Sequence, residues 1–228
     1  MIPVWEKMPR EMQTETVRRY YDALRKKKGT LIAKRCFDVF ASLVLIVILS
    51  PLFCVLAVMI KKDSKGPVFY RQERVTQYGR VFRVFKFRTM VQDADKIGTH
   101  VTVEGDPRIT RVGAKIRDSR LDEIPQLFNI LGGSMSFVGT RPEAVKYVKQ
   151  YTDEMNATLL LPAGVTSEAS IRFKDEAKML DGAEDVDKAY VEKVLPQKMK
   201  YNLEYLLDCT FGGDVKLMLK TVTKVREK

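Results

Sequence analysis

The chain has 228 residues, a formal net charge of +11 and a hydrophobic content of 45%. This length allows one domain with a packed core, or one domain together with a membrane anchor. The basic charge favours anionic partners such as nucleic acid, anionic lipid or phosphorylated small molecules. Three cysteines without a CxxC pair and a single histidine argue against a disulfide framework, a zinc site and a Ser-His-Asp triad. Carboxylates are therefore the main candidates for acid-base chemistry.

Residues 1–33 form a basic N-terminal leader. Within it, Val17, Tyr20, Tyr21 and Leu24 recur at helical spacing, which predicts a short amphipathic helix. A solvated basic segment explains the same composition equally well.

A long apolar segment follows the leader, and we assign residues 34–62 to the membrane. Its core, Val39–Ile60, would reach about 33 Å as a straight helix, which is enough to span a bilayer. Pro51, preceded by Ser50, lies in the middle, where proline removes a backbone hydrogen bond and bends a helix. Basic residues flank both ends, and the positive-inside rule then places both ends in the cytoplasm. We therefore predict a re-entrant hairpin that breaks at Ser50 and Pro51. A spanning helix is the first alternative and a buried core helix the second.

Residues 63–228 are expected to form a cytoplasmic domain. The segment Gly66–Met90 has strand-like composition on both sides of a turn candidate, Gln77–Arg80, and predicts a β-hairpin. Basic side chains alternate with aromatic ones along it, which favours contact with an anion. A solvated sheet face is the alternative.

The most informative stretch is Arg117–Glu143, where Asp122 and Glu123 stand together at the predicted start of an apolar helix capped by Ser119. An aspartate can attack phosphorus and form an acyl phosphate when arginines or Mg²⁺ offset the phosphate charge. Taken alone, however, an acidic pair at a helix start more often serves to stabilise the helix dipole.

Longer motifs occur in order from Lys34 onward. They are KRCFD (Lys34–Asp38), KGPVFYRQERV (Lys65–Val75), FKFRTM (Phe85–Met90), GDPRITRVG (Gly105–Gly113), RLDEIPQLFNIL (Arg120–Leu131), MSFVGTRPE (Met135–Glu143) and LPQKMKYNLEYLLD (Leu195–Asp208). In these motifs the chain resembles the bacterial sugar transferase family, the monotopic phosphoglycosyl transferases. It is similar to the small form without a multi-span N-terminal domain.

The resemblance implies a reaction. A phospho-sugar would pass from a UDP-sugar to polyprenyl (undecaprenyl) phosphate at the cytoplasmic face of the bacterial inner membrane, with release of UMP, and would begin a lipid-linked glycan. By the family pattern, Asp122 is the nucleophile, with Mg²⁺ bound beside it, and Glu123 is the assisting carboxylate. The substrate- and phosphate-binding candidates are Lys34, Arg35, Arg74, Lys86, Arg88, Arg108, Arg111, Arg117, Arg141, Pro142 and Glu143.

Some positions depart from the family pattern. Thr140 stands where proline is common, Thr76 where glycine is common and Arg120 where serine is common, and the segment Leu161–Arg172 also differs. These departures leave the nucleotide contacts and the choice of sugar open.

The expected fold is α+β and mostly helical. A re-entrant membrane helix would join a cytoplasmic catalytic domain with a small β-hairpin and amphipathic interfacial helices. We expect a UDP-sugar, polyprenyl phosphate and membrane lipid as partners and no nucleic acid, and we leave a homo-oligomer open. The alternative function is an inactive membrane-bound scaffold or binding protein of the same fold.

Overall fold

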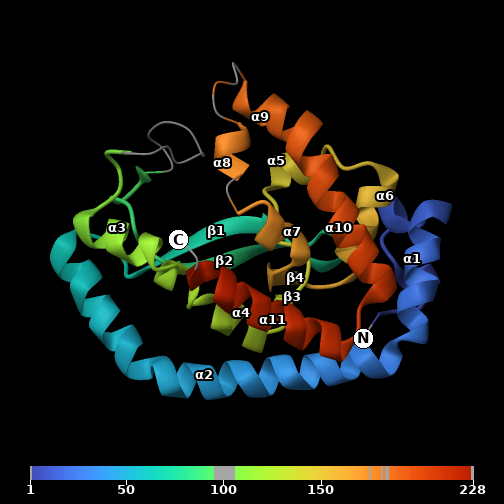
Figure 1. The fold of residues 1–228 in the computed structure, drawn as a ribbon, viewed down its shortest axis with the longest axis horizontal. Coiled ribbons are helices and arrows are strands. Elements are labelled where there is room, and N and C mark those ends of the chain that lie inside the picture. Colours follow the sequence, from blue (N-terminus) through green and yellow to red (C-terminus); the bar gives the residue numbers. More distant parts are fainter. Residues whose placement is uncertain (1, 95–105, 175, 181, 183–184, 227–228) are drawn as a thin grey trace.

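A computed structural model of the chain describes residues 2–94, 106–174, 176–180, 182 and 185–226. Met1 of the leader and Gly105 of the GDPRITRVG motif lie outside the described residues. One long helix runs along an edge of the molecule, and the other elements lie on its concave side (Figure 1).

The long helix, α2 (Lys28–Asp63), contains the whole apolar segment. It passes through Ser50 and Pro51 without interruption and bends in its C-terminal part (Figure 1). The predicted break into two helices is therefore wrong. Pro51 cannot donate a hydrogen bond to the carbonyl of Val47, but the Ser50 hydroxyl donates to that oxygen at 2.8 Å. Because a hydroxyl replaces the missing backbone donor, the helix bends and continues.

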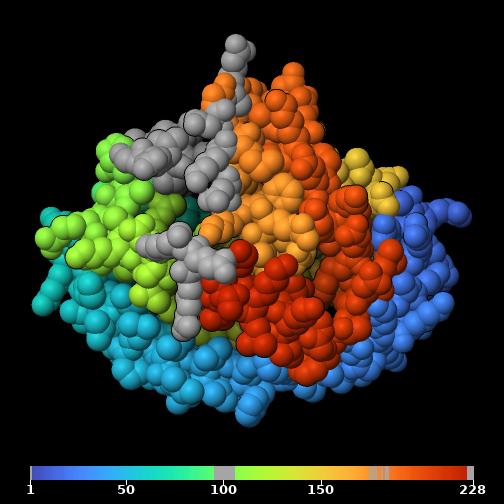
Figure 2. Space-filling view, viewed as in Figure 1, coloured from blue at the N-terminus to red at the C-terminus, as the bar shows by residue number. Residues whose placement is uncertain are grey.

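One side of α2 packs on the protein and the other is exposed. Leu56 and Ile60 are buried against Phe87 and Ile116. Only 11% of the most apolar stretch of the helix is buried in the protein. The helix is also long and apolar enough to cross a membrane. This burial argues against a core helix. Figure 2 shows α2 along one edge of the molecular surface. Its exposed apolar side chains are Ile32, Val39, Phe40, Leu43, Val44, Val47, Ile48, Val55, Val58 and Met59.

Two basic side chains attach the N-terminal part of α2 to the rest of the chain. Lys34 Nζ lies 2.6 Å from Asp214 Oδ2 of helix α11 (Phe211–Arg226), and both side chains are buried. The Arg35 guanidinium donates at 2.7 and 2.9 Å to the last two carbonyls of helix α4 (Gln126–Leu131). A guanidinium suits these carbonyls because the C-terminus of a helix carries partial negative charge.

The C-terminal end of α2 is attached in the same way. The Asp63 carboxylate accepts from the backbone N–H of Val112 at 2.8 Å, near the start of helix α3 (Arg111–Asp118). Arg88 Nη2 donates to the Ser64 carbonyl at 2.7 Å. Both ends of α2 are thus fixed to one body of protein.

The predicted β-hairpin is confirmed. Strand β1 (Phe69–Val75) pairs antiparallel with β2 (Val81–Phe87) over their whole length. The turn between them is the short helix η3 (Gln77–Gly79), in which Tyr78 and Gly79 adopt positive φ angles of 61° and 72°.

A second two-stranded sheet was not predicted. It pairs β3 (Met135–Val138) parallel with β4 (Ala163–Thr166). The predicted amphipathic helix of the leader is confirmed as α1 (Glu15–Lys26), which packs against α10 (Leu195–Asp208). The remaining elements are η1 (Trp5–Lys7), η2 (Arg10–Met12), η5 (Leu121–Glu123), α5 (Val145–Val148), α6 (Asp153–Asn156), η6 (Ala157–Leu160), α7 (Glu168–Arg172), α8 (Glu176–Met179), α9 (Val186–Ala189) and η7 (Tyr190–Val194).

Replacing Lys34 by alanine should lower the free energy of unfolding by roughly 3–5 kcal/mol, because it leaves Asp214 buried without its cation. The matched double variant Lys34→Met with Asp214→Leu should recover most of this loss, since apolar residues often replace a buried ion pair without penalty. Urea unfolding of the detergent-solubilised protein measures both effects. Equal stability of Lys34→Ala and the parent chain would contradict a stabilising role for this ion pair.

Candidate active site

The acidic pair lies on a tight turn. Asp122 and Glu123 belong to η5 (Leu121–Glu123), a single 3₁₀ turn between α3 and α4, and not to the first turn of a long helix. The predicted cap is also wrong, because Ser119 ends α3 and its hydroxyl donates back to that helix. Arg120 follows with a left-handed φ of 57°, a conformation that is uncommon for residues with a Cβ. This residue turns the chain so that α3 leads directly into the acidic pair.

Glu123 is held by two cations. Its carboxylate lies 2.5 Å from Arg141 Nη2 and 3.4 Å from Lys86 Nζ. Burial alone would raise the pKa of Glu123, but the charges of Arg141 and Lys86 outweigh it and hold the pKa well below its ordinary value. Glu123 is therefore an ionised carboxylate with its charge already offset.

Asp122 has the opposite character. Burial raises its pKa, and the negative charge of Glu123 adds to this effect, while Lys86 and Arg117 oppose it. The side chain faces a cavity of about 400 Å³, which we call the Asp122 cavity. The cations that line this cavity are Lys86, Arg88, Arg108 and Arg117.

Arg88 links the Asp122 cavity to the end of α2. The residue is only 6% exposed, and its Nη2 is used by the end of α2. Within the described part of the chain, its Nε and Nη1 atoms have no hydrogen-bond partner. Gly66 gives the guanidinium room, because a Cβ there would lie 2.1 Å from Nη1. Buried N–H groups without a partner are costly, and an anion in the cavity would satisfy them.

A second cavity of about 490 Å³ borders the first, and we call it the Arg141 cavity. It shares Lys86 with the Asp122 cavity and is lined on the other side by Pro142 and Glu143. Arg74 also lines it, and burial lowers the pKa of that guanidinium. The structure thus brings together the predicted candidates from the hairpin, the LDE turn and the GTRPE segment.

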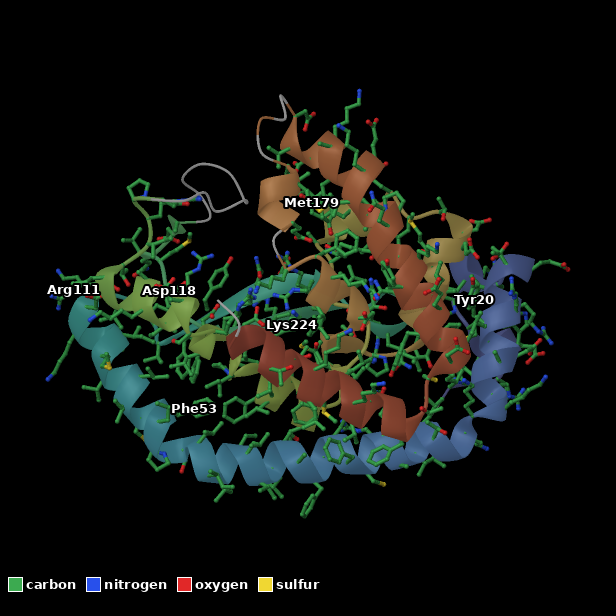
Figure 3. The ribbon with its side chains drawn as sticks, viewed as in Figure 1. Tyr20, Phe53, Arg111, Asp118, Met179 and Lys224 are labelled. Carbon is green, nitrogen blue, oxygen red and sulfur yellow. The ribbon has the colours of Figure 1, made fainter. Side chains whose placement is uncertain are left out.

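Other predicted phosphate ligands lie elsewhere or are already engaged. Lys34 and Arg35 anchor α2 and line neither cavity. Arg111 is exposed at the far end of α3, beside the end of α2 (Figure 3). Arg108 does line the Asp122 cavity, where Asp106 holds its Nε and Nη2 atoms at 2.9 and 2.6 Å.

Sequence reasoning missed two buried residues at the Arg141 cavity. Lys198, on α10, is 5% exposed and contacts Glu143 at 2.9 Å and the Tyr190 hydroxyl at 2.7 Å. Gln126 is 3% exposed, and its Oε1 has no hydrogen-bond partner among the described residues. Gln126 directly follows the LDEIP residues, and that adjacency was the available signal. Nothing local to Lys198 distinguishes it from the other lysines of the chain.

The acidic pair suits a metal that is held mainly by substrate. No group of three His, Cys, Asp or Glu side chains that could hold a metal occurs in the part of the chain that the structure describes. Glu123 is engaged by Arg141 and Lys86, so Asp122 is the member of the acidic pair that faces the cationic cavity. Mg²⁺ is commonly bound by one or two carboxylates together with substrate phosphates. Asp122 fits that kind of site.

Comparison with known proteins agrees with the sequence motifs. The chain is 34% identical over 198 residues to the UDP-glucose:undecaprenyl-phosphate glucose-1-phosphate transferase of Escherichia coli (strain K12). The matched stretch covers 85% of this chain and 40% of that protein. It is 34% identical over 195 residues to the UDP-N-acetylgalactosamine-undecaprenyl-phosphate N-acetylgalactosaminephosphotransferase of Aeromonas hydrophila, covering 84% and 43%. It is 46% identical over 116 residues to the exopolysaccharide production protein PSS of Rhizobium leguminosarum bv. phaseoli, covering 50% and 58%.

The chain spans less than two thirds of the length of each of these relatives. The family model described as bacterial sugar transferase, however, matches residues 29–228, which is nearly the whole chain. The predicted resemblance is confirmed, and the chain belongs to the bacterial sugar transferase family.

Proposed function

We propose that the chain transfers a phospho-sugar from a UDP-sugar to polyprenyl phosphate through a covalent intermediate on Asp122. The observation that carries this proposal is the position of Asp122 in a cavity lined by four cations, next to a carboxylate whose charge is already offset. The names of the E. coli and A. hydrophila relatives support the reaction class. Those names give two different sugars, so the sugar for this chain stays open.

The reaction would proceed in two displacements. An Asp122 carboxylate oxygen attacks the phosphorus that bears the sugar, and the bond from that phosphorus to the UMP oxygen breaks. An oxygen of polyprenyl phosphate then attacks the same phosphorus, and the bond to Asp122 breaks, which restores the carboxylate. Arg88, Arg108 and Arg117 line the cavity where the phosphate charge must be offset.

Glu123 would hold two cations in place and would not transfer a proton. Its low pKa makes it a poor proton donor, and its contacts hold Arg141 and Lys86 at the border of the two cavities. We also propose that Asp122 and the substrate phosphates bind Mg²⁺, which when bound would offset phosphate charge.

We further propose that α2 enters and leaves the membrane on one side. Its N-terminal part is tied to α11 and α4, and its C-terminal end to α3 and Arg88. A helix that crossed the bilayer would carry these two sets of contacts to opposite sides, although they belong to one body of protein. The exposed apolar side chains between them would face lipid, with the chain on the cytoplasmic face of the inner membrane.

The covalent mechanism predicts a half-reaction. With UDP-sugar alone, the enzyme should release up to about one UMP per active site and gain the mass of a phospho-sugar. Asp122→Asn should reduce this burst at least about a thousandfold, because an amide is not a nucleophile toward phosphorus. Asp118→Asn is a matched control, since Asp118 is exposed and lies outside the Asp122 cavity. A full burst in Asp122→Asn would contradict the nucleophile assignment. No burst in the parent chain, with or without acceptor, would favour the scaffold alternative.

The pKa of Asp122 predicts the pH dependence of UMP release. The attacking form is the carboxylate, and burial raises its pKa, so the rate should fall on acidification at a higher pH than for an ordinary aspartate. Arg117→Gln removes a positive charge that lowers this pKa, and it should move the acid limb to still higher pH. The measurement is kcat/KM for the UDP-sugar against pH. A limb that moves to lower pH in Arg117→Gln would show that another group controls the rate.

The proposed topology can be tested with single cysteines at positions 26 and 65 in a chain without Cys36, Cys54 and Cys209. Both should resist an impermeant thiol reagent in intact cells and react after permeabilisation, because both ends of α2 would lie in the cytoplasm. Labelling of one site from outside would establish a spanning helix.

A further inference from the structure

A third and larger cavity, of about 780 Å³, lies between α2, α4, α7 and α11, and we call it the α2 cavity. Its apolar lining includes Leu45 and Leu49 of α2 and Ile171 of α7. Its polar end is formed by Glu123 and Arg141. Asp118, at the end of α3, and Lys224, near the end of α11, also line it (Figure 3). The cavity therefore leads from the membrane helix to the LDE turn.

The apolar end of this cavity begins within the lipid-facing segment. Leu45 and Leu49 are half-buried and face the cavity, one helical turn apart. Between them, Val47 and Ile48 are exposed at 65% and 64% on the outer side of the same helix. A hydrocarbon chain next to α2 could thus enter the cavity without crossing water.

The polar end carries cations beside the reacting centre. Arg120 lines the cavity, is exposed, and contributes a positive charge that lowers the pKa of Glu123. Its left-handed backbone is of the kind that costs energy and concentrates at functional sites. Gln126 also lines this end, nine-tenths buried and with an unpartnered oxygen among the described residues. Both residues are within four positions of Asp122.

We infer that the α2 cavity binds the acceptor, with the isoprenoid chain against Leu45, Leu49 and Ile171 and the phosphate at Arg120. This inference rests on the proposed function, in which a lipid phosphate must reach Asp122. An ordinary phospholipid would fit the apolar end equally well. The acceptor is favoured over a phospholipid because the cationic end of the cavity lies beside the LDE turn. In the proposed reaction only the acceptor phosphate has to come close to that turn.

The test uses the full chain in nanodiscs of phosphatidylcholine, with undecaprenyl phosphate as the probe and native mass spectrometry to measure occupancy. Leu49→Trp and Ile171→Trp fill the cavity from two different elements and should weaken binding at least about tenfold. Val47→Trp is the matched control, because it adds the same side chain to the exposed side of α2. It should bind the probe as the parent chain does.

Arg120→Asn tests the phosphate end, since asparagine tolerates the left-handed conformation while the charge is lost. The KM for undecaprenyl phosphate should rise about tenfold or more while the KM for the UDP-sugar changes less than about twofold. Equal changes in both values would overturn the assignment of Arg120 to the acceptor.

The first half-reaction separates this inference from the proposed function. Both tryptophan variants should still release UMP from UDP-sugar without lipid, which also shows that they fold. Loss of probe binding together with this burst supports the α2 cavity as the acceptor site. Unchanged binding in both variants overturns the inference, as does displacement of the probe by an equal amount of phosphatidylglycerol. A parent chain without a burst, but with cavity-dependent binding, would overturn the covalent mechanism and leave the acceptor site standing.

Discussion

The attachment of α2 at both of its ends is the constraint on which the rest of the structure depends. Near the start of the helix, the buried carboxylate of Asp38 accepts from the Phe137 backbone N–H at 3.1 Å, one turn after the Lys34–Asp214 ion pair. At the other end, Arg88 donates from Nη2 to the Ser64 carbonyl and also lines the Asp122 cavity. The position of the candidate active site relative to α2 is therefore set by buried polar contacts, which are costly to break.

The adjacent carboxylates of Asp122 and Glu123 lie in different electrostatic environments. Glu123 has two close cations and a pKa well below its ordinary value, whereas burial raises the pKa of Asp122. A fully paired carboxylate organises its cations but is a weak nucleophile, because its charge is already offset. Asp122 has no ion pair with the described residues, and a partly desolvated carboxylate of this kind keeps its reactivity and depends on the substrate site for compensation. The two environments belong to adjacent residues of one 3₁₀ turn.

The β-hairpin and the leader helix could be predicted because short-range patterns determine them, whereas the acidic pair was expected at a helix start and lies on a 3₁₀ turn. The hairpin followed from strand composition on both sides of the turn candidate Gln77–Arg80, and α1 from four apolar residues at helical spacing. The anchoring roles of Lys34 and Arg35 could not be predicted. The residues around Lys34 in the sequence do not show whether its ammonium binds a phosphate or the carboxylate of Asp214, which is 180 positions away. The predicted break at Pro51 was wrong because a prediction from proline alone does not include the Ser50 hydroxyl. That hydroxyl donates to the Val47 carbonyl and replaces the hydrogen bond that Pro51 cannot make.

The shared walls of the three cavities give the proposed reaction an electrostatic order. Lys86 belongs to both the Asp122 and Arg141 cavities, and Arg141 to both the Arg141 and α2 cavities. The negative charge of a bound diphosphate would lower the positive potential around Lys86 and Arg141. A second phosphate in the α2 cavity would then be attracted less strongly. In the proposed reaction, departure of UMP would remove negative charge from the shared wall and would make the cationic end of the α2 cavity more attractive to the acceptor. Sharing of cations between cavities thus supplies a physical reason for the nucleotide to leave before the lipid phosphate reacts.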